Sequence, residues 1–308
     1  MENLLEVKNL QFSFRTYGGV VKAVRDVSFE VRPGEILGIV GESGCGKSVL
    51  CKSIMKLLPP SAKIKEGSIC VNGQDITCYR EREMQKLRGR VFAMIFQDPM
   101  SYLNPIVTIE KQMTEGIRAH DKCSKQEARE RAIELMKMVG IPAPESRLKQ
   151  YPFEFSGGMR QRIIIAIALA CNPKLIVADE PTTALDVTVQ AQILDLLRKI
   201  TEESDAGVII ITHDLGVVAS LCDRISIMYG GNIMEEGTTD EIFYDPKHPY
   251  TKGLLNSIAN SNADHREPLK PIPGTPPDLL KLVCFPMQRG NGNLYKGNTA
   301  CDRIWRDT

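Results

Sequence analysis

The chain has 308 residues, of which 43% are hydrophobic and 25% charged, a composition typical of a soluble globular protein. Its formal net charge is +1, so no overall positive field favours nucleic acid as the partner. The apolar runs are too short to cross a bilayer and no secretion signal opens the sequence, so we expect neither a membrane span nor secretion. Nine scattered cysteines without a C-x-x-C pair are expected to be reduced cytosolic thiols.

The first ninety or so residues are predicted to be rich in β-structure. Apolar and polar positions alternate in residues 4–14, 23–31 and 68–73, and turn residues such as Pro33-Gly34 separate them. Residues 35–40, EILGIV, form a continuous apolar run instead. Because this run does not alternate, it indicates a strand buried on both faces, as in a parallel sheet.

Helical patterns follow over about residues 98–151. One helix is expected to begin after Ser124 and to end at Gly140. Two further buried strands, in 174–180 and 207–214, are separated by an amphipathic helix over 187–204. The sequence therefore predicts one α/β core that is interrupted by a helical insert. After about Tyr250 the chain is rich in Pro, Asn and Gly and is predicted to be an extended tail.

The segment GESGCGKS fits the phosphate-loop pattern G-x-x-x-x-G-K-[S/T] between a strand and a helix. Its glycines let backbone N–H groups face phosphate oxygens, Lys47 neutralises the β and γ phosphates, and Ser48 can ligate Mg²⁺. A glycine-rich turn with a surface lysine is the alternative, but the full pattern in its strand–loop–helix setting favours the phosphate loop. The predicted nucleotide contacts here are Gly41, Glu42, Ser43, Gly44, Cys45, Gly46, Lys47, Ser48 and Val49.

Polar residues end three of the strand-like runs. Asp179 is expected to hold Mg²⁺, and Glu180, the next residue, to orient and deprotonate an attacking water. His213 ends another strand, and parallel strands deliver their carboxyl ends to one edge of a sheet. Gln97 ends a strand-like run in the same way. Its amide could reach the metal or the water, although an ordinary turn fits the sequence equally well.

A second loop rich in backbone N–H groups, FSGGMRQR, precedes the apolar run IIIAIALA. Such a loop in front of a helix can hold an anion. The chain already has a phosphate loop more than a hundred residues earlier, so the residues alone leave open why one protein carries two.

The order GESGCGKS, FQDP, FSGGMRQR, LIVADEPTTALD and ITHD resembles the nucleotide-binding subunit of ABC transporters over roughly the first 240 residues. The resemblance implies a P-loop NTPase core with an N-terminal antiparallel β subdomain, and the ligands ATP and Mg²⁺. It also implies that two subunits close head to tail, so that the second loop serves the ATP held by the partner. Under this interpretation Ser156, Gly157 and Gly158 bind the partner's γ phosphate.

Other roles are carried over by the same resemblance. Gln97 becomes the Q-loop residue and a metal ligand, Asp186 the D-loop aspartate, and His213 the switch histidine. Tyr17 is the expected aromatic on adenine, although Phe14 lies nearby and such aromatics often only pack. The family's usual signature is Leu-Ser-Gly-Gly-Gln, and this chain has Phe and Met at its two ends. A similar variant occurs in one of the two ATPases of oligopeptide and dipeptide importers.

The C-terminal part supports that subfamily. DPKHPYTKGLL followed by PIPGTPPDL looks like the extension on ATPases of peptide and nickel importers, which divides the chain into an ATPase domain, 1–245, and an extension, 246–308. Some relatives carry an iron–sulfur cluster there. Here only Cys284 and Cys301 remain, and Gly290 stands where another cysteine is expected, so we predict no cluster.

The resemblance predicts an ATPase subunit on the cytoplasmic face of the membrane that energises uptake of di- and oligopeptides. Its expected partners are a second, similar ATPase subunit, two transmembrane permease subunits and, indirectly, an extracellular solute-binding protein. Import of nickel or a metal chelate is the alternative within the family. ABC ATPases that act on nucleic acid or ribosomes are the alternative class, disfavoured by one module and near-zero net charge. A regulatory subunit with a dead site conflicts with the intact phosphate loop and paired acids.

Overall fold

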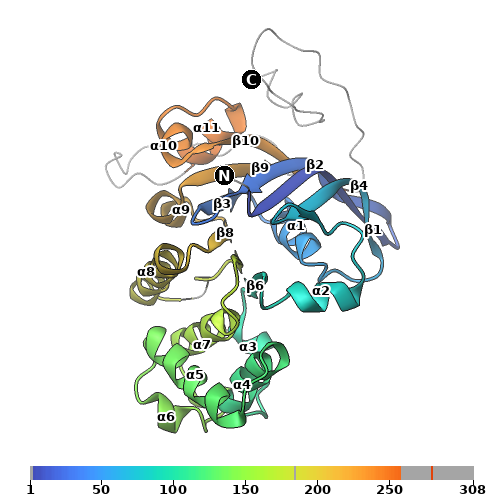
Figure 1. Cartoon of the computed structure of the whole chain (residues 1–308). Helices are drawn as coiled ribbons and strands as arrows, with labels where there is room; N and C mark the ends of the chain where they lie inside the picture. The colour runs from blue at the N-terminus through green and yellow to red at the C-terminus, as the bar shows by residue number, and fades with distance from the viewer. Residues whose placement is uncertain (1–2, 184, 258–278, 280–308) are drawn as a thin grey trace. The chain divides into compact units, whose positions relative to one another are not determined.

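The computed structural model describes residues 3–183, 185–257 and 279 (Figure 1). These residues form two compact units, and the chain passes between them several times. The first unit comprises the described residues of 1–5, 31–36 and 71–212, and the second those of 6–30, 37–70 and 213 onward.

The first unit is built on three parallel strands. β7 (Leu175–Asp179) lies between β6 (Phe92–Ile95) and β8 (Gly207–Thr212), and every residue of the three strands is buried. Leu175 pairs with Phe92 on one side and with Gly207 on the other. The strands therefore run in register, and residues that follow β6 and β7 emerge at the same edge.

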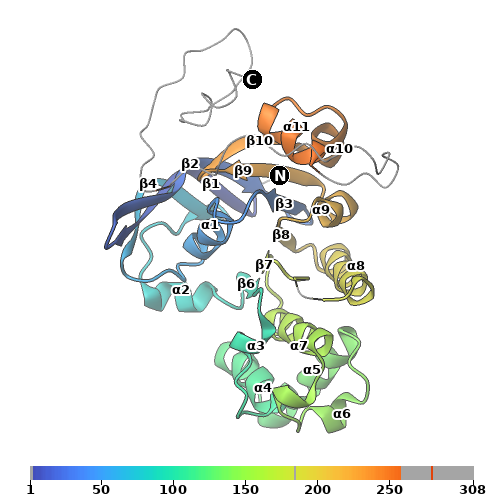
Figure 2. The same ribbon diagram turned by 180° about the vertical axis from the view of Figure 1, so that it is seen from behind.

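The first unit also contains helices and one short strand. They are α2 (Glu81–Leu87), α3 (Pro99–Tyr102), α4 (Ile109–His120), α5 (Lys125–Met138), α6 (Pro144–Arg147), a 3₁₀ turn (Pro152–Glu154), α7 (Gly157–Leu169) and α8 (Val187–Ser204), with a short strand β5 (Gln74–Asp75). Helices α4, α5 and α7 pack together in both views (Figures 1 and 2). The helical region expected over about 98–151 is therefore present.

The ends of α5 follow the sequence prediction. The Ser124 hydroxyl accepts a hydrogen bond from the Glu127 N–H at 3.2 Å, and the Glu127 carboxylate accepts one from the Ser124 N–H at 2.7 Å. This reciprocal capping box satisfies two N–H groups at the start of the helix. Gly140, with φ of 75°, follows the last turn, where a left-handed residue commonly ends a helix.

The second unit contains two groups of strands. β1 (Leu5–Thr16) lies between β2 (Gly19–Val31) and β4 (Ala62–Val71). These strands confirm that the start of the chain is rich in β-structure. β3 (Ile36–Val40) pairs parallel with β9 (Arg224–Tyr229), which pairs antiparallel with β10 (Asn232–Thr238). The helices of this unit are α1 (Lys47–Ile54), α9 (Leu215–Leu221), α10 (Thr239–Tyr244) and α11 (Pro249–Asn256). No helix in the described parts of either unit is long and apolar enough to cross a bilayer.

Helix α11 corrects one sequence prediction. Extended chain was expected from about Tyr250, but residues 250–256 are helical because Pro249 occupies the first helical position, where a missing N–H is harmless. The His248 ring accepts a hydrogen bond from the Tyr250 N–H at 3.1 Å and so caps the helix. Both views show α11 beside β10 (Figures 1 and 2). Cys284, Gly290 and Cys301 lie outside the described residues.

Candidate active site

The phosphate loop of the second unit joins β3 to α1. Gly44 and Gly46 have φ of 82° and 107°, conformations that side-chain-bearing residues rarely adopt. A Cβ at Gly46 would lie 2.3 Å from the Ala23 carbonyl oxygen, and one at Gly41 only 2.0 Å from the Met228 carbonyl oxygen. These glycines therefore let the loop press against neighbouring backbone while it keeps its shape.

Lys47 is the first residue of α1 and its side chain is 5% exposed. Its ammonium donates to the carbonyl oxygens of Gly41 at 2.6 Å and Glu42 at 2.9 Å, which orients the charge within the loop. The Cys45 sulfur is 3.8 Å from the same nitrogen. Burial raises the pKa of this thiol, and the Lys47 charge opposes the rise only in part, so the thiol stays neutral at pH 7. The Lys47 ammonium is thus a positive charge held in a fixed position within the loop.

Several other predicted site residues of this unit are more exposed than Lys47. Tyr17 is fully exposed, whereas the Phe14 ring packs edge-on against Phe12 with centroids 5.5 Å apart. Of the two candidates for the adenine contact, Tyr17 is thus the one whose ring is not used in packing. His213 is exposed and directly precedes Asp214, whose carboxylate accepts from the Gly216 N–H at 2.8 Å at the start of α9. Ser48 and Val49 lie half-buried in the first turn of α1.

The first unit brings Gln97 and Glu180 together. Gln97 comes two residues after β6 and Glu180 directly after β7, and the Gln97 Nε2 donates to Glu180 Oε2 at 2.8 Å. Thr183 also donates to this oxygen, at 2.9 Å, a contact that the sequence reasoning missed. Glu180 has φ of 47°, a left-handed conformation that is unfavourable for a glutamate. Asp179, the last residue of β7, is 3% exposed. The carboxylate of a residue with an unfavourable backbone conformation is thus held in place by two donors.

A stacked aromatic pair borders this cluster and was also missed. The rings of Phe96 and Tyr102 have centroids 3.6 Å apart and lie within 9° of parallel. Partial burial raises the pKa of the Tyr102 hydroxyl, and the negative charges of Asp179 and Asp98 raise it further. Tyr102 therefore lies close to the buried acid. The only sequence signal for it was an aromatic residue five positions after Gln97.

The second anion-binding loop begins α7. Ser156 is the N-cap residue, and its hydroxyl accepts from the Met159 N–H at 3.4 Å. Ser156 and Gly157 are exposed, so the amino end of this 13-residue helix faces solvent with its positive dipole. Phe155 is only 3% exposed, which shows that the aromatic variant of this position serves packing.

Asp186 lies near the same loop. Its carboxylate accepts from the Val189 N–H at 2.9 Å and caps α8. A Cβ at Gly158 would lie 2.8 Å from the Val189 Cγ1 atom, so the starts of α7 and α8 are in contact. The exposed loop and the Asp186 cap therefore form one continuous surface.

The residues fit the predicted ligands in chemistry. Ser48, Gln97 and Asp179 offer hydroxyl, amide and carboxylate oxygens, the donors that Mg²⁺ prefers. In the described part of the chain, no three His, Cys, Asp or Glu side chains cluster in a way that could hold a metal by themselves. The predicted residues fall into two groups. Tyr17, residues 41–49 and His213 belong to one unit, and Gln97, Asp179, Glu180, residues 156–158 and Asp186 belong to the other.

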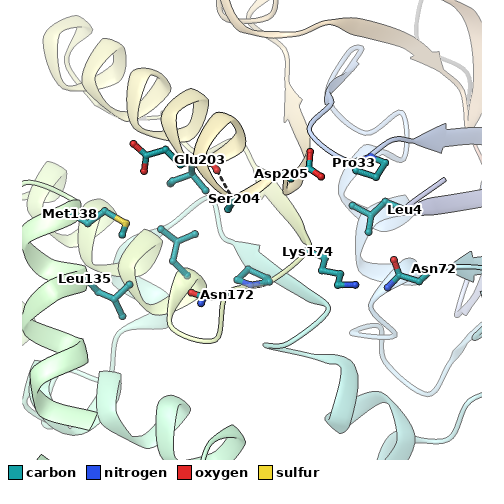
Figure 3. Close-up of a pocket in the computed structure, with 13 residues that line it drawn as sticks. Leu4, Pro33, Asn72, Leu135, Met138, Asn172, Lys174, Glu203, Ser204 and Asp205 are labelled. Atoms are coloured by element: carbon teal, nitrogen blue, oxygen red, sulfur yellow. Dashed lines mark hydrogen bonds between the residues drawn. The ribbon is translucent and has the colours of Figure 1, made fainter. Parts of the chain in front are cut away.

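A separate cavity of about 620 Å³ lies in the first unit (Figure 3). Lys174 and Asp205 line it, together with apolar side chains that include Leu135 and Met138. Lys174 precedes β7, whereas Glu180 follows it, so the cavity is at the opposite end of the strand from the acidic cluster. None of the predicted site residues lines it, and its size alone does not make it the active site.

Comparison with known proteins identifies the family. A family model described as ABC transporter matches residues 24–183, and the phosphate loop, Asp179 and Glu180 fall inside this match. The chain belongs to the ABC transporter family. A second model, the C-terminal region of oligopeptide/dipeptide transporters, matches residues 234–285. The family relationship means that the chain binds ATP and couples its hydrolysis to transport, with permease subunits in the membrane as partners.

Individual relatives support the assignment over most of the chain. The oligopeptide transport ATP-binding protein of Bacillus subtilis is 57% identical over 90% of this chain and 77% of its own length. The dipeptide transport ATP-binding protein of the same organism is 55% identical over 91% of this chain and 84% of its own length.

Solved structures confirm the predicted fold. A dimeric ATP-binding cassette bound to ADP and Pi, in a post-hydrolysis state, has a TM-score of 0.69 at 30% identity and covers 76% of this chain and 98% of its own. The structure of cbiO1 from Clostridium perfringens, part of the ABC transporter complex cbiONQ, has a TM-score of 0.67 at 26% identity, covering 80% of this chain and 92% of its own. The fold is that of an α/β P-loop NTPase.

Proposed function

We propose that this chain is the ATP-hydrolysing subunit of an importer of di- and oligopeptides. The single observation that carries the hydrolytic role is the held carboxylate of Glu180, which accepts from Gln97 and Thr183 at the end of β7 in a chain that also has a complete phosphate loop. The peptide substrate rests on relatives at 57% and 55% identity that are named as oligopeptide and dipeptide transport proteins.

Each group has a definite task in the proposed reaction. The phosphate loop holds the β and γ phosphates, and the Lys47 ammonium offsets their charge. The Glu180 carboxylate accepts a proton from the water as its oxygen attacks the γ phosphorus, and the bond to the β–γ bridging oxygen breaks. Gln97 orients the carboxylate, and His213 contacts the γ phosphate. When bound, Mg²⁺ neutralises phosphate charge, and Ser48, Asp179 and Gln97 would hold it.

The proposed working unit is a pair of ATPase subunits arranged head to tail. Ser156, Gly157 and Gly158 of one subunit would bind the γ phosphate held by the other, with Asp186 beside them. Exposure of the amino end of α7 supports this, because a helix terminus that faces solvent can receive an anion from another chain. The dimeric relative bound to ADP and Pi is also consistent with it. We propose a second, similar ATPase as the partner.

The pair would sit on the cytoplasmic face of the membrane under two permease subunits. The helical region, about 98–151, would pass the closing and opening of the pair to the permease, and Gln97 at its base would link that movement to nucleotide state. We propose 1–245 as the ATPase domain and 246–308 as the C-terminal extension, and expect no iron–sulfur cluster in the latter.

Uptake by whole cells tests this function. Cells whose own copy carries Glu180→Gln should lose uptake of labelled di- and oligopeptides and keep uptake of nickel or a nickel chelate. Glu203→Gln, an exposed acid near the end of α8, is the matched control and should keep peptide uptake. Loss of nickel uptake alone would move the assignment to metal import. Unchanged uptake of both solutes would refute the transport role and favour an ATPase that acts on nucleic acid or ribosomes.

A further inference from the structure

Tyr250 is a buried aromatic residue outside the nucleotide-binding motifs. It is the second residue of α11, and its side chain is 0% exposed. Its ring lies 4.4 Å, centroid to centroid, from the ring of Tyr229 at the end of β9. Tyr229 lines a cavity of about 190 Å³ together with Glu42, Ser43, Gly44 and Cys45 of the phosphate loop. Tyr250 therefore packs against a residue that borders this loop.

The same strand end contacts the loop through backbone. The Gly231 N–H donates to the Cys45 carbonyl oxygen at 2.9 Å, and the Arg25 N–H donates to the Gly231 carbonyl oxygen at 2.7 Å. A Cβ at Gly41 would lie 2.0 Å from the Met228 carbonyl oxygen, so the two segments are in direct contact at this point. Because packed interiors transmit small displacements, a shift of residues 228–231 must also shift the loop.

The Tyr250 hydroxyl also lies near the loop. Burial raises its pKa most, and the negative charge of Glu42 raises it further, while the backbone of Glu42 opposes the rise. Within the described residues the hydroxyl has no hydrogen-bond partner of ordinary geometry. The contact is therefore made by the ring, and phenylalanine should replace tyrosine here with little effect.

A side chain of β10 holds the backbone just before Tyr250 through hydrogen bonds. One carboxylate oxygen of Glu235 accepts from the Lys247 N–H at 2.6 Å, and the other accepts from the His248 N–H at 3.0 Å. His248 is 8% exposed, and its ring accepts a hydrogen bond from the Tyr250 N–H. A chain of polar contacts thus holds the start of α11 in place and presses the Tyr250 ring onto Tyr229.

We propose that Tyr250 is a positioning residue for the phosphate loop, through which the start of the C-terminal extension supports nucleotide binding. The residue touches no nucleotide itself and acts through Tyr229 and residues 42–45. The inference rests on the proposed function, because it requires that this loop binds ATP.

The test compares three variants of the full chain. Tyr250→Leu removes the ring, Tyr250→Phe keeps it, and Tyr244→Leu changes an 85% exposed tyrosine on neighbouring α10 as the matched control. The dissociation constant for ATP and the KM in the assembled transporter should rise about tenfold in Tyr250→Leu, as misplacement of a binding group predicts. Its kcat at saturating ATP should stay within about twofold, and the other two variants should match the wild type within the same margin.

Wild-type ATP affinity in folded Tyr250→Leu would overturn the proposal, as would a lower kcat at unchanged KM. If Tyr250→Leu does not fold, Glu235→Gln weakens the charged acceptor of two N–H groups while the ring stays. It should bind ATP several-fold more weakly, and unchanged affinity would again overturn the proposal. Failure of the wild-type chain to bind ATP would instead refute the proposed function, so the two failures can be told apart.

Discussion

Replacement of Glu180 by glutamine should separate ATP binding from hydrolysis. Glutamine has nearly the same shape, and its amide oxygen can accept from both Gln97 and Thr183, which donate at 2.8 and 2.9 Å to one oxygen of the native carboxylate. The amide cannot take a proton from water. Loss of a positioned general base lowers turnover by about 10²–10⁴-fold, or roughly 2.7–5.5 kcal/mol of barrier.

Stability should change far less, because two hydrogen bonds lose only their charge assistance at a half-exposed site. We expect a change within about 1 kcal/mol in the free energy of unfolding. The assay is phosphate release by the assembled transporter at saturating ATP, with ATP affinity measured on the same preparation and Glu203→Gln as control. Turnover of Glu180→Gln within threefold of wild type would remove Glu180 from the role of base.

Four further substitutions follow from the same structure. Gly41→Ala should abolish ATP binding because its Cβ would lie 2.0 Å from the Met228 carbonyl oxygen, and binding of ATP by the purified variant would contradict the tight packing. Ser156→Arg, combined with a wild-type partner, should block only the site that the partner's phosphate loop forms; single-turnover hydrolysis at both sites would exclude the head-to-tail arrangement. Ser124→Ala should destabilise the protein by about 1 kcal/mol through loss of the α5 cap. The Ser124 N–H, which donates to the Glu127 carboxylate, holds the pKa of that carboxyl below its usual range, so this bond contributes above about pH 4.3 and its contribution is lost as pH falls through the lowered pKa. Denaturant unfolding of Ser124→Ala at pH 7 checks the first point. Glu127→Gln should destabilise the protein more at pH 7 than at pH 3, and an equal effect at the two values would contradict the second point.

Local chemistry made several elements predictable from the sequence. The ends of α5 follow from Ser124 and Gly140, whose side chain and backbone freedom act within one helical turn. The buried strand β7 follows from an apolar run without alternation, and the closeness of Gln97 and Glu180 follows from parallel strands that end at one edge. These inferences need only neighbours in sequence or a general property of parallel sheets.

Other features depend on contacts that no local pattern encodes. Helix α11 was missed because the Pro-, Asn- and Gly-rich composition after about Tyr250 was interpreted as extended chain, although proline, as Pro249 shows, suits the first position of a helix. The Thr183 hydroxyl donates to the Glu180 carboxylate, and Glu180 adopts a left-handed conformation that no sequence pattern predicts for a glutamate. The burial of Tyr250 against Tyr229 joins residues 21 positions apart, and the sequence gives no period that relates them.

The central claim is that ATP hydrolysis by this chain drives peptide movement. The most direct measurement uses proteoliposomes that contain the assembled transporter, with labelled peptide and its solute-binding protein on one side and ATP on the other. The account predicts peptide accumulation with wild-type chain and ATP, and none with ADP or with Glu180→Gln. Equal accumulation with wild type and Glu180→Gln, or ATP hydrolysis without any peptide movement, would contradict it.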